Sequence, residues 1–219
     1  MRPPGAGEGE LRTAIVTTAR AMNAAGINRG KSGNVSARTG AGFLITPTGI
    51  PYDATTADDI VAMTLDGEAR GNRAPSSEWR FHRDLYRARD EFNAIVHAHA
   101  PFATALACLH RGIPPFHYMV AVAGGPDIRC APYATFGSPE LAVLAVAAMA
   151  GRRACLLANH GMIAAGRDLA GALALAIEVE GLAEMYSRAL QIGEPALLSG
   201  AEMEVVLGKF RTYGQPDAD

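Results

Sequence analysis

Apolar residues recur every three to four positions over several stretches of the chain, and this spacing predicts amphipathic helices. In the first stretch, one face is formed by Leu11, Ile15, Ala19 and Met22. We therefore expect a helix over 10–25, ended by Gly26. The same spacing predicts helices over 140–150 and 169–190. A further helix is expected to begin with Ser76 as its N-cap.

Short apolar runs between glycine-rich turns predict β-strands. Residues 35–38 and 43–46 form an expected hairpin, because Thr39–Gly42 supplies turn residues between them. Further strands are expected over 60–65, 93–99 and 154–158. Several strands are joined by hairpins rather than by crossovers, and no G-x-G-x-x-G follows an early strand. We therefore predict an α/β domain with a largely antiparallel central sheet, covered by helices on both faces, rather than a Rossmann fold.

The length and composition of the chain narrow the possible functions. A chain of 219 residues suits one domain over 1–219, in which we expect residues 1–9 to be flexible. Hydrophobic residues make up 49% and charged residues 19%, which argues against disorder. The formal net charge is -2, without long blocks of like charge. Nucleic acid and anionic membranes are therefore not expected partners.

Three features predict a cytoplasmic location. The longest apolar run, LAVLAVAAMA at 141–150, is too short to span a bilayer. The N-terminus lacks the apolar stretch of a signal peptide. The three cysteines are widely spaced, form no C-x-x-C pair, and are typical of small buried side chains in a reducing compartment.

Histidines form the most informative chemical pattern. His97 and His99 lie two positions apart on an expected strand, so both side chains point to one face, roughly 7 Å apart at the backbone. His160 follows a second apolar strand and precedes Gly161. Three imidazoles with an open position are typical of a catalytic zinc site. The alternative is a chance H-A-H pair and a core histidine. His82, His110 and His117 are interpreted as structural, His82 by packing on a helix face.

Polar residues gather in three loops that could hold a phosphate group. Glu78 directly follows Ser76-Ser77 at an expected helix start, where free backbone N–H groups bind anions. A simple capped helix with a dipole-favourable acid is the alternative interpretation. The loops at 33–36 and 46–49 also offer amides and hydroxyls at strand ends. Together with the histidines, they predict a metal site beside a phosphate site.

A string of motifs resembles the class II aldolase/adducin family. The motifs follow in order across nearly the whole chain: SGNVSAR at 32–38, ITPTGIPYD at 45–53, PSSEWRFH at 75–82, VHAHA at 96–100, IPPFHYMVAVAGG at 113–125, CAPYATFG at 130–137, NHGMIA at 159–164 and KFRTYG at 209–214. The resemblance implies the adducin-head-like fold of this family in a single domain. Two positions depart from the fuculose aldolase pattern, Ala98 between the zinc histidines and Asn159 before His160.

The resemblance also implies the roles of individual residues. One Zn²⁺ per subunit would be held by His97, His99, His160 and Glu78, and Glu78 would also act as catalytic acid/base. The phosphate group would be held by Asn34, Thr48, Gly49, Ser76 and Ser77. Tyr118 would reach the site of a neighbouring subunit and move the proton of the aldehyde oxygen.

The resemblance assigns a covering role to the end of the chain. Tyr213 would lie on a C-terminal tail, 209–219, that covers the site. The aldehyde end would be lined by Phe136 and Phe210. A homotetramer with active sites at subunit interfaces is the implied assembly.

The implied reaction is zinc-dependent cleavage of a ketose 1-phosphate, of the L-fuculose 1-phosphate type, to dihydroxyacetone phosphate and a small aldehyde such as L-lactaldehyde. One alternative is an aldolase acting on 5-deoxyribulose 1-phosphate or 5-methylthioribulose 1-phosphate in salvage, which would share the catalytic set. Another is a pentulose-phosphate 4-epimerase, although its pattern resembles S-S-D where this chain has Ser76-Ser77-Glu78. A dehydratase of methylthioribulose phosphate is a more distant possibility. An adducin-type interaction module would be expected to lack the metal ligands.

Overall fold

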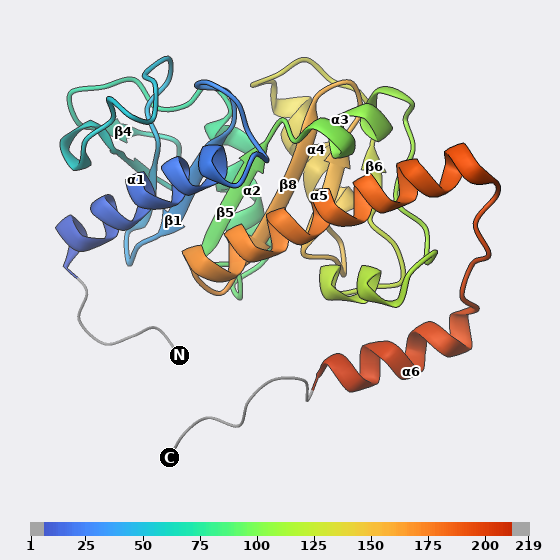
Figure 1. Cartoon of the computed structure of the whole chain (residues 1–219). Coiled ribbons are helices and arrows are strands. Elements are labelled where there is room, and N and C mark those ends of the chain that lie inside the picture. The colour runs from blue at the N-terminus through green and yellow to red at the C-terminus, as the bar shows by residue number, and fades with distance from the viewer. Residues whose placement is uncertain (1–6, 212–219) are drawn as a thin grey trace.

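The computed structural model describes residues 7–211 and is built on one eight-stranded sheet (Figure 1). The strand order is β4-β3-β2-β1-β5-β8-β7-β6. Every neighbouring pair is antiparallel except β6 and β7, which run parallel. The strands are β1 (Asn34–Arg38), β2 (Gly42–Ile45), β3 (Val61–Thr64), β4 (Ala69–Arg70), β5 (Ala94–Ala98), β6 (Cys130–Ala131), β7 (Ala154–Leu157) and β8 (Gly161–Gly166). The predicted α/β class with a largely antiparallel sheet is confirmed.

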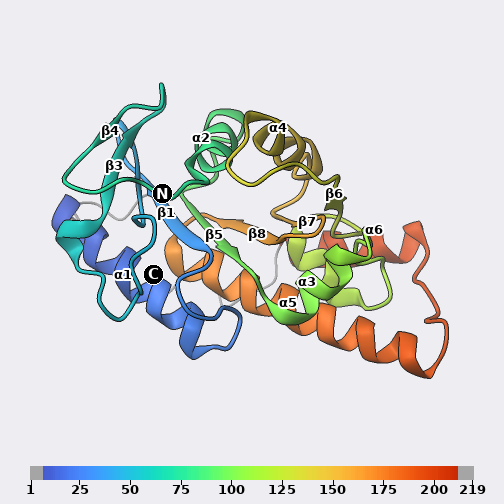
Figure 2. The ribbon, with the colours of Figure 1, turned by 90° about the horizontal axis from the view of Figure 1, so that it is seen from above.

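Helices cover both faces of this sheet (Figure 2). The α-helices are α1 (Glu8–Ala24), α2 (Trp79–Ala88), α3 (Pro101–Cys108), α4 (Pro139–Ala148), α5 (Leu169–Ile192) and α6 (Gly200–Phe210), and two 3-10 helices are η1 (Ala57–Asp59) and η2 (Tyr118–Ala123). One layer contains α1, α3 and α5, and the other contains α2 and α4. Each layer encloses its own apolar core. Within the described part of the chain, no helix combines the length and apolar character needed to cross a membrane.

The central strand β5 divides its side chains between the two cores. Val96 points into the core beneath α1, α3 and α5, whereas Ile95 points into the core beneath α2 and α4. Because side chains alternate along a strand, His97 lies on the α2 side with Ile95. In the sheet register Asn34 of β1 pairs with His97. The sheet itself therefore brings an amide side chain beside a fully buried imidazole.

The start of α3 is fixed directly after the second histidine of the H-A-H pair. Glu180 on α5 accepts hydrogen bonds from the backbone N–H groups of Phe102 and Ala103, both at 2.8 Å. Pro101 occupies the first turn, where its missing N–H costs no helical bond. The Glu180 carboxylate therefore anchors the N-terminus of α3, the helix that follows β5.

The expected N-cap at Ser76 is wrong. Helix α2 begins at Trp79, and its N-cap residue is Glu78. Ser76 instead lies two residues before the N-cap, where its Oγ accepts from the backbone N–H of Glu78 at 3.3 Å. Its own backbone N–H donates to the Thr46 carbonyl at 3.0 Å, and Pro75 forms a β-bridge with Pro47. This pairing ties the serine loop to the loop after β2, so both face the same space.

The sequence pattern also missed several elements. Strand β8 is built of small residues, GMIAAG, without the β-branched alternation that signals a strand. Those small residues allow close packing, since a Cβ at Gly166 would lie 2.6 Å from the backbone nitrogen of Ala172 on α5. Helix α6, capped by Ser199, was not predicted. Glu8 and Gly9, expected in a flexible segment, form the first turn of α1.

Candidate active site

A cavity of about 340 Å³ opens where three polar loops meet the ends of β1, β5 and β7. One side is formed by the three predicted phosphate loops and the other by aromatic and polar residues that precede α4 or connect β7 to β8. Its lining residues are Lys31, Ser32, Gly33, Asn34, Pro47, Thr48, Gly49, Ser76, Ser77, Glu78, His99, Tyr133, Ala134, Phe136, Asn159 and His160. All five predicted phosphate-loop residues, and Phe136, therefore border one space.

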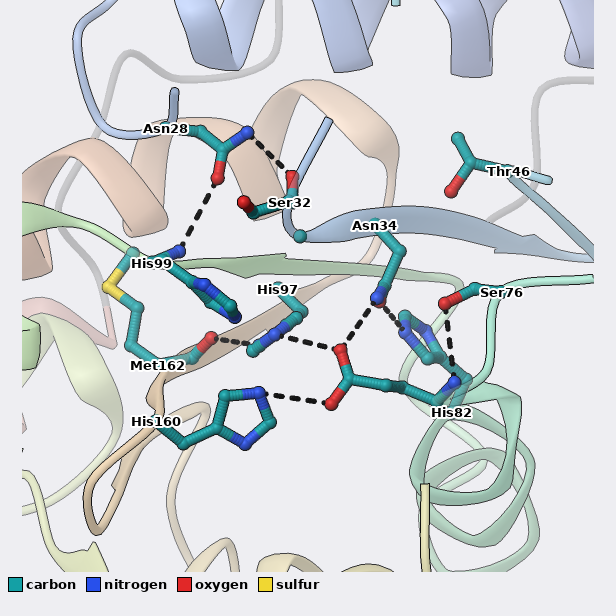
Figure 3. A network of polar contacts seen from close by, with 12 residues as sticks. Asn28, Ser32, Asn34, Thr46, Ser76, His82, His97, His99, His160 and Met162 are labelled. Carbon is teal, nitrogen blue, oxygen red and sulfur yellow. Dashed lines mark hydrogen bonds and ion pairs between the residues drawn. The ribbon is translucent and has the colours of Figure 1, made fainter. Parts of the chain in front are cut away.

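Four potential metal ligands converge at the floor of this cavity. One ligand atom from each of Glu78, His97, His99 and His160 lies within 4.8 Å of the other three. The three imidazole rings have centroids 4.8 to 5.1 Å apart and stand edge to face, gathered together in Figure 3. They come from the end of β5 and from the β7–β8 connection. His99 and His160, 61 positions apart in the chain, thus meet in one partly buried cluster.

The hydrogen bonds of His97 determine which of its nitrogens faces the cluster. Its Nδ1 lies 2.9 Å from the carbonyl oxygen of Met162, which can only accept, so Nδ1 carries the proton (Figure 3). In the neutral form of the ring, which is the form that binds a metal, Nε2 then carries a lone pair that points toward Glu78 Oε2, 3.1 Å away. A lone pair opposite a carboxylate oxygen is unfavourable unless a cation lies between them. This orientation, with Nδ1 bonded to a carbonyl, is the usual one for a histidine that binds a metal.

The remaining polar atoms of the cluster fit the same interpretation. Five buried side-chain polar atoms within residues 7–211 have no hydrogen-bond partner, and three of them are Glu78 Oε1, His97 Nε2 and His99 Nε2. Glu78 Oε1 lies 3.0 Å from His160 Nε2. Buried polar groups without partners are rare, so their concentration here indicates that the donor set is built for a cation. Three imidazoles and one carboxylate match a metal centre.

The protonation of the cluster also favours a cation. Burial acts to raise the pKa of Glu78, but the neighbouring His97 and His160 outweigh it and hold the pKa well below its usual range. Burial, with the charges of His97 and His160, lowers the pKa of His99 to about 4. At neutral pH the carboxyl group is therefore ionised and His99 is neutral, which are the forms that bind metals.

Two glycines allow the polar loops to approach the cluster closely. Gly33 has φ +73°, and a Cβ there would lie 2.5 Å from the His97 carbonyl oxygen. The Tyr52 hydroxyl holds this loop by donating to the carbonyls of Ser32 and Gly33 at 3.0 and 2.8 Å. Gly137 has φ +71°, and a Cβ there would lie 2.7 Å from the Ser77 carbonyl oxygen. Both contacts require glycine for steric as well as conformational reasons.

Several residues that border the cavity were not assigned from the sequence. Lys31 is the one lysine among the described residues that line it, where no arginine occurs, and its Nζ lies 3.4 Å from the Gly49 carbonyl oxygen. Its position in a glycine-rich turn is the sequence feature that could have identified it as a cavity residue. Tyr133 belongs to the CAPYATFG motif and is 57% exposed. Asn159 has φ +54° and accepts from His110 Nε2 at 2.6 Å if that nitrogen carries the proton.

Two of the predicted residues do not line this cavity within one chain, and a third lies outside the described residues. Tyr118 begins η2, is 51% exposed and does not line the cavity. Its role in a neighbouring subunit stays a prediction. Phe210 was expected at the aldehyde end, but α6 packs against η2 and Phe210 is partly buried against the main core, so it does not line the cavity of its own chain. Tyr213 lies outside the described residues.

Comparison with known proteins places the chain in a family. The sequence profile of the class II aldolase and adducin N-terminal domain matches residues 13–187. A 5-methylthioribulose-1-phosphate/5-deoxyribulose-1-phosphate aldolase from Rhodospirillum rubrum is 57% identical over 204 residues, covering 93% of this chain and 92% of that protein. An L-fuculose phosphate aldolase from Escherichia coli is 48% identical over 206 residues, covering 94% and 96%.

Solved structures agree with the sequence comparisons. An L-fuculose 1-phosphate aldolase structure superposes with a TM-score of 0.90 at 42% identity, covering 92% of this chain and 96% of the other. The chain belongs to the class II aldolase/adducin family and is a metal-dependent class II aldolase.

We expect His97→Ala and His160→Ala each to abolish stoichiometric metal binding, because each removes one nitrogen ligand from the cluster of four. Substitutions outside the ligand set typically lower metal affinity by about 10- to 100-fold. The loss of Zn²⁺ affinity in these two ligand variants should be larger than that. Metal content after dialysis against equimolar Zn²⁺ measures the effect. His117→Ala is the control, since His117 caps η2, and it should keep one ion per chain. Full Zn²⁺ occupancy in both ligand variants would contradict the assignment.

Proposed function

We propose that this chain cleaves 5-deoxyribulose 1-phosphate or 5-methylthioribulose 1-phosphate to dihydroxyacetone phosphate and a short aldehyde, with Zn²⁺ as its metal. The observation that carries the proposal is the cluster of Glu78, His97, His99 and His160 beside a cavity with a donor-rich end and an aromatic end. The 57% identical relative, named for both substrates, supports this choice. The initial preference for L-fuculose 1-phosphate has less support.

The aromatic end favours an aldehyde with an apolar tail. Tyr133 and Phe136 are more than half exposed and line the cavity with Ala134. Cleavage of the two proposed substrates leaves acetaldehyde or its methylthio derivative, whereas L-fuculose 1-phosphate leaves an aldehyde with an additional hydroxyl group. Aromatic surface gains more from covering a methyl or methylthio group than from covering a hydroxyl that it cannot hydrogen-bond. L-Fuculose 1-phosphate remains the second candidate because of the 48% identical relative.

The opposite end of the cavity suits the phosphate group. Thr48, Gly49, Ser76 and Ser77 border it, and residues of these types offer hydroxyl and backbone N–H donors. Lys31 adds a positive charge to this end, which strengthens hydrogen bonding to a dianion. Holding the phosphate there fixes the distance between the reacting carbons and the metal ligands.

Glu78, His97, His99 and His160 would hold the metal. When bound, a divalent ion supplies Lewis-acid stabilisation of the negative charge that develops as the carbon–carbon bond breaks. Three imidazoles and a carboxylate suit zinc. Glu78 is the proposed acid/base that returns a proton to C3 of the dihydroxyacetone phosphate fragment.

The remaining proton transfer is assigned to a second subunit. Removing the proton of the C4 hydroxyl starts the cleavage, and Tyr118 of a neighbouring chain is proposed for it, with Tyr213 on the covering tail. Exposure of Tyr118 on η2 is compatible with a contact between chains. A cytoplasmic homotetramer is the proposed form of the enzyme.

A 4-epimerase would break and re-form the same kind of bond without releasing products. Release of dihydroxyacetone phosphate therefore discriminates between the two activities. With Zn²⁺-loaded protein, we expect kcat/KM for 5-deoxyribulose 1-phosphate to exceed that for L-fuculose 1-phosphate by about 10-fold or more, and a chelator should stop both reactions. A higher value for L-fuculose 1-phosphate would reverse the substrate assignment. No release from any of the three substrates would contradict the aldolase proposal.

The role of Glu78 is tested by Glu78→Gln, which keeps the shape of the side chain but cannot accept a proton. We expect kcat to fall by about 10²- to 10⁴-fold, the typical contribution of a general acid/base. Exchange of a C3 hydrogen of dihydroxyacetone phosphate with deuterated solvent should fall in parallel. Circular dichroism and metal content check that the variant is folded and loaded. Near-parental exchange in loaded protein would remove Glu78 from the proton transfer.

A further inference from the structure

A buried chain of hydrogen bonds leads from the second turn of α2 to Glu78. Tyr86 OH lies 2.8 Å from Ser36 Oγ, which lies 2.7 Å from His82 Nδ1. His82 Nε2 contacts Asn34 Oδ1, and Asn34 Nδ2 donates to Glu78 Oε2 at 3.0 Å (Figure 3). Tyr86, Ser36 and His82 are fully buried, and the other two residues are nearly so.

This chain of hydrogen bonds follows from the periodicity of a strand and the periodicity of a helix. Asn34 and Ser36 lie two positions apart on β1 and therefore share one face of the sheet. Glu78, His82 and Tyr86 lie four positions apart at the start of and along α2, and therefore share one face of that helix. The two faces meet, so the hydrogen bonds alternate between strand and helix. His82 is held further by stacking on Phe81, with ring centroids 4.6 Å apart.

The carboxylate fixes the direction of every bond in the chain. Ionised Glu78 can only accept, so the Asn34 amide presents its NH₂ group to it and its Oδ1 to His82. Oδ1 can only accept, so His82 carries its proton on Nε2. A neutral imidazole then has a lone pair on Nδ1, which accepts from the Ser36 hydroxyl, and Ser36 accepts from Tyr86. Burial and the charge of His97 lower the pKa of His82 to about 3, whereas Glu78 acts to raise it, which is consistent with a neutral ring.

We propose that His82 is a positioning residue of this aldolase, which holds the Asn34 amide in the orientation that fixes Glu78 for proton transfer. This inference rests on the proposed function of Glu78. Without the Nε2 proton of His82, Asn34 keeps only its bond to the carboxylate, so its amide is held at one end instead of two and positions Glu78 less rigidly. Asn34 also borders the cavity, so a less rigid amide changes the surface that meets the substrate. From sequence alone, His82 was interpreted as a packing residue. The chain of hydrogen bonds adds the positioning role.

The inference is tested by two substitutions at His82 that differ in hydrogen bonding. His82→Phe keeps an aromatic ring on Phe81 but donates no proton to Asn34, whereas the amide of His82→Gln can donate to Asn34 and accept from Ser36. In Zn²⁺-loaded protein, we expect His82→Phe to lower kcat by about 10- to 100-fold with little change in KM, the range typical of groups that orient metal ligands. His82→Gln should recover much of the loss. Tyr86→Phe, which removes only the last donor of the chain, is the matched control and should stay within a few-fold of the parent.

Parental kcat in loaded His82→Phe, or equal losses in the Phe and Gln variants, would overturn the inference in favour of packing alone. If neither variant folds, Ser36→Ala replaces them. It removes the hydroxyl that fixes the Nδ1 lone pair, so it should lower kcat without loss of Zn²⁺, and unchanged kcat would count against the proposal.

A measurement on the parent protein separates this inference from the proposed function. Long-range ¹H–¹⁵N NMR of the imidazole rings reports tautomers without any turnover. We expect the Nε2–H tautomer for His82 and the Nδ1–H tautomer for His97. An Nδ1–H signal for His82 would overturn the inference. If His82 shows Nε2–H but the parent releases no dihydroxyacetone phosphate, the hydrogen-bond chain is supported and the proposed function fails instead.

Discussion

Glu78 and three imidazoles occupy one small, partly buried space, and the rest of the structure depends on how their electrostatics are balanced. Four ligand atoms lie within 4.8 Å of one another, and in the neutral form of His97 a lone pair rather than an N–H group faces the carboxylate. Burying such a set is costly unless a cation is bound among them. The fold keeps the ligands in this position through the sheet register and through hydrogen bonds from neighbouring strands.

The sheet and its neighbours supply that support at three points. The register of β1 against β5 pairs Asn34 with His97, and the carbonyl of Met162 on β8 fixes the His97 ring. Gly33 lets its loop approach the β5 backbone more closely than any side chain would allow. The same proximity places the proposed phosphate loops beside the candidate metal ligands, because the loop that approaches β5 also borders the cavity. The proposed metal and phosphate sites thus share backbone.

Sequence patterns predicted the parts of the structure that depend on local periodicity. Strand alternation at His97 and His99 correctly indicated a shared face, and hairpin signals gave the antiparallel sheet. The motifs carried the assignment to the family and most of the residues that border the cavity. They did so because those residues occur in short continuous segments.

The missed features depend on contacts between distant segments. Ser76 lies in a loop two residues before the N-cap of α2, and its backbone pairs with Thr46, 30 positions earlier. Strand β8 was missed because alanine and glycine carry little strand preference, although their small size is what its contact with α5 requires. His82 looked like a packing residue until its partners Asn34 and Ser36 were known. The position of Phe210 depends on the docking of α6 against η2, which no local pattern records.

The central claim is that one metal ion bound by Glu78 and the three histidines serves a phosphorylated substrate held by the adjacent loops. A crystal structure of the Zn²⁺-loaded protein with dihydroxyacetone phosphate tests it most directly. We predict one anomalous peak among His97, His99 and His160, with the phosphate beside Lys31, Thr48 and Ser77. A metal bound elsewhere, or a phosphate at the Tyr133 end of the cavity, would contradict the claim.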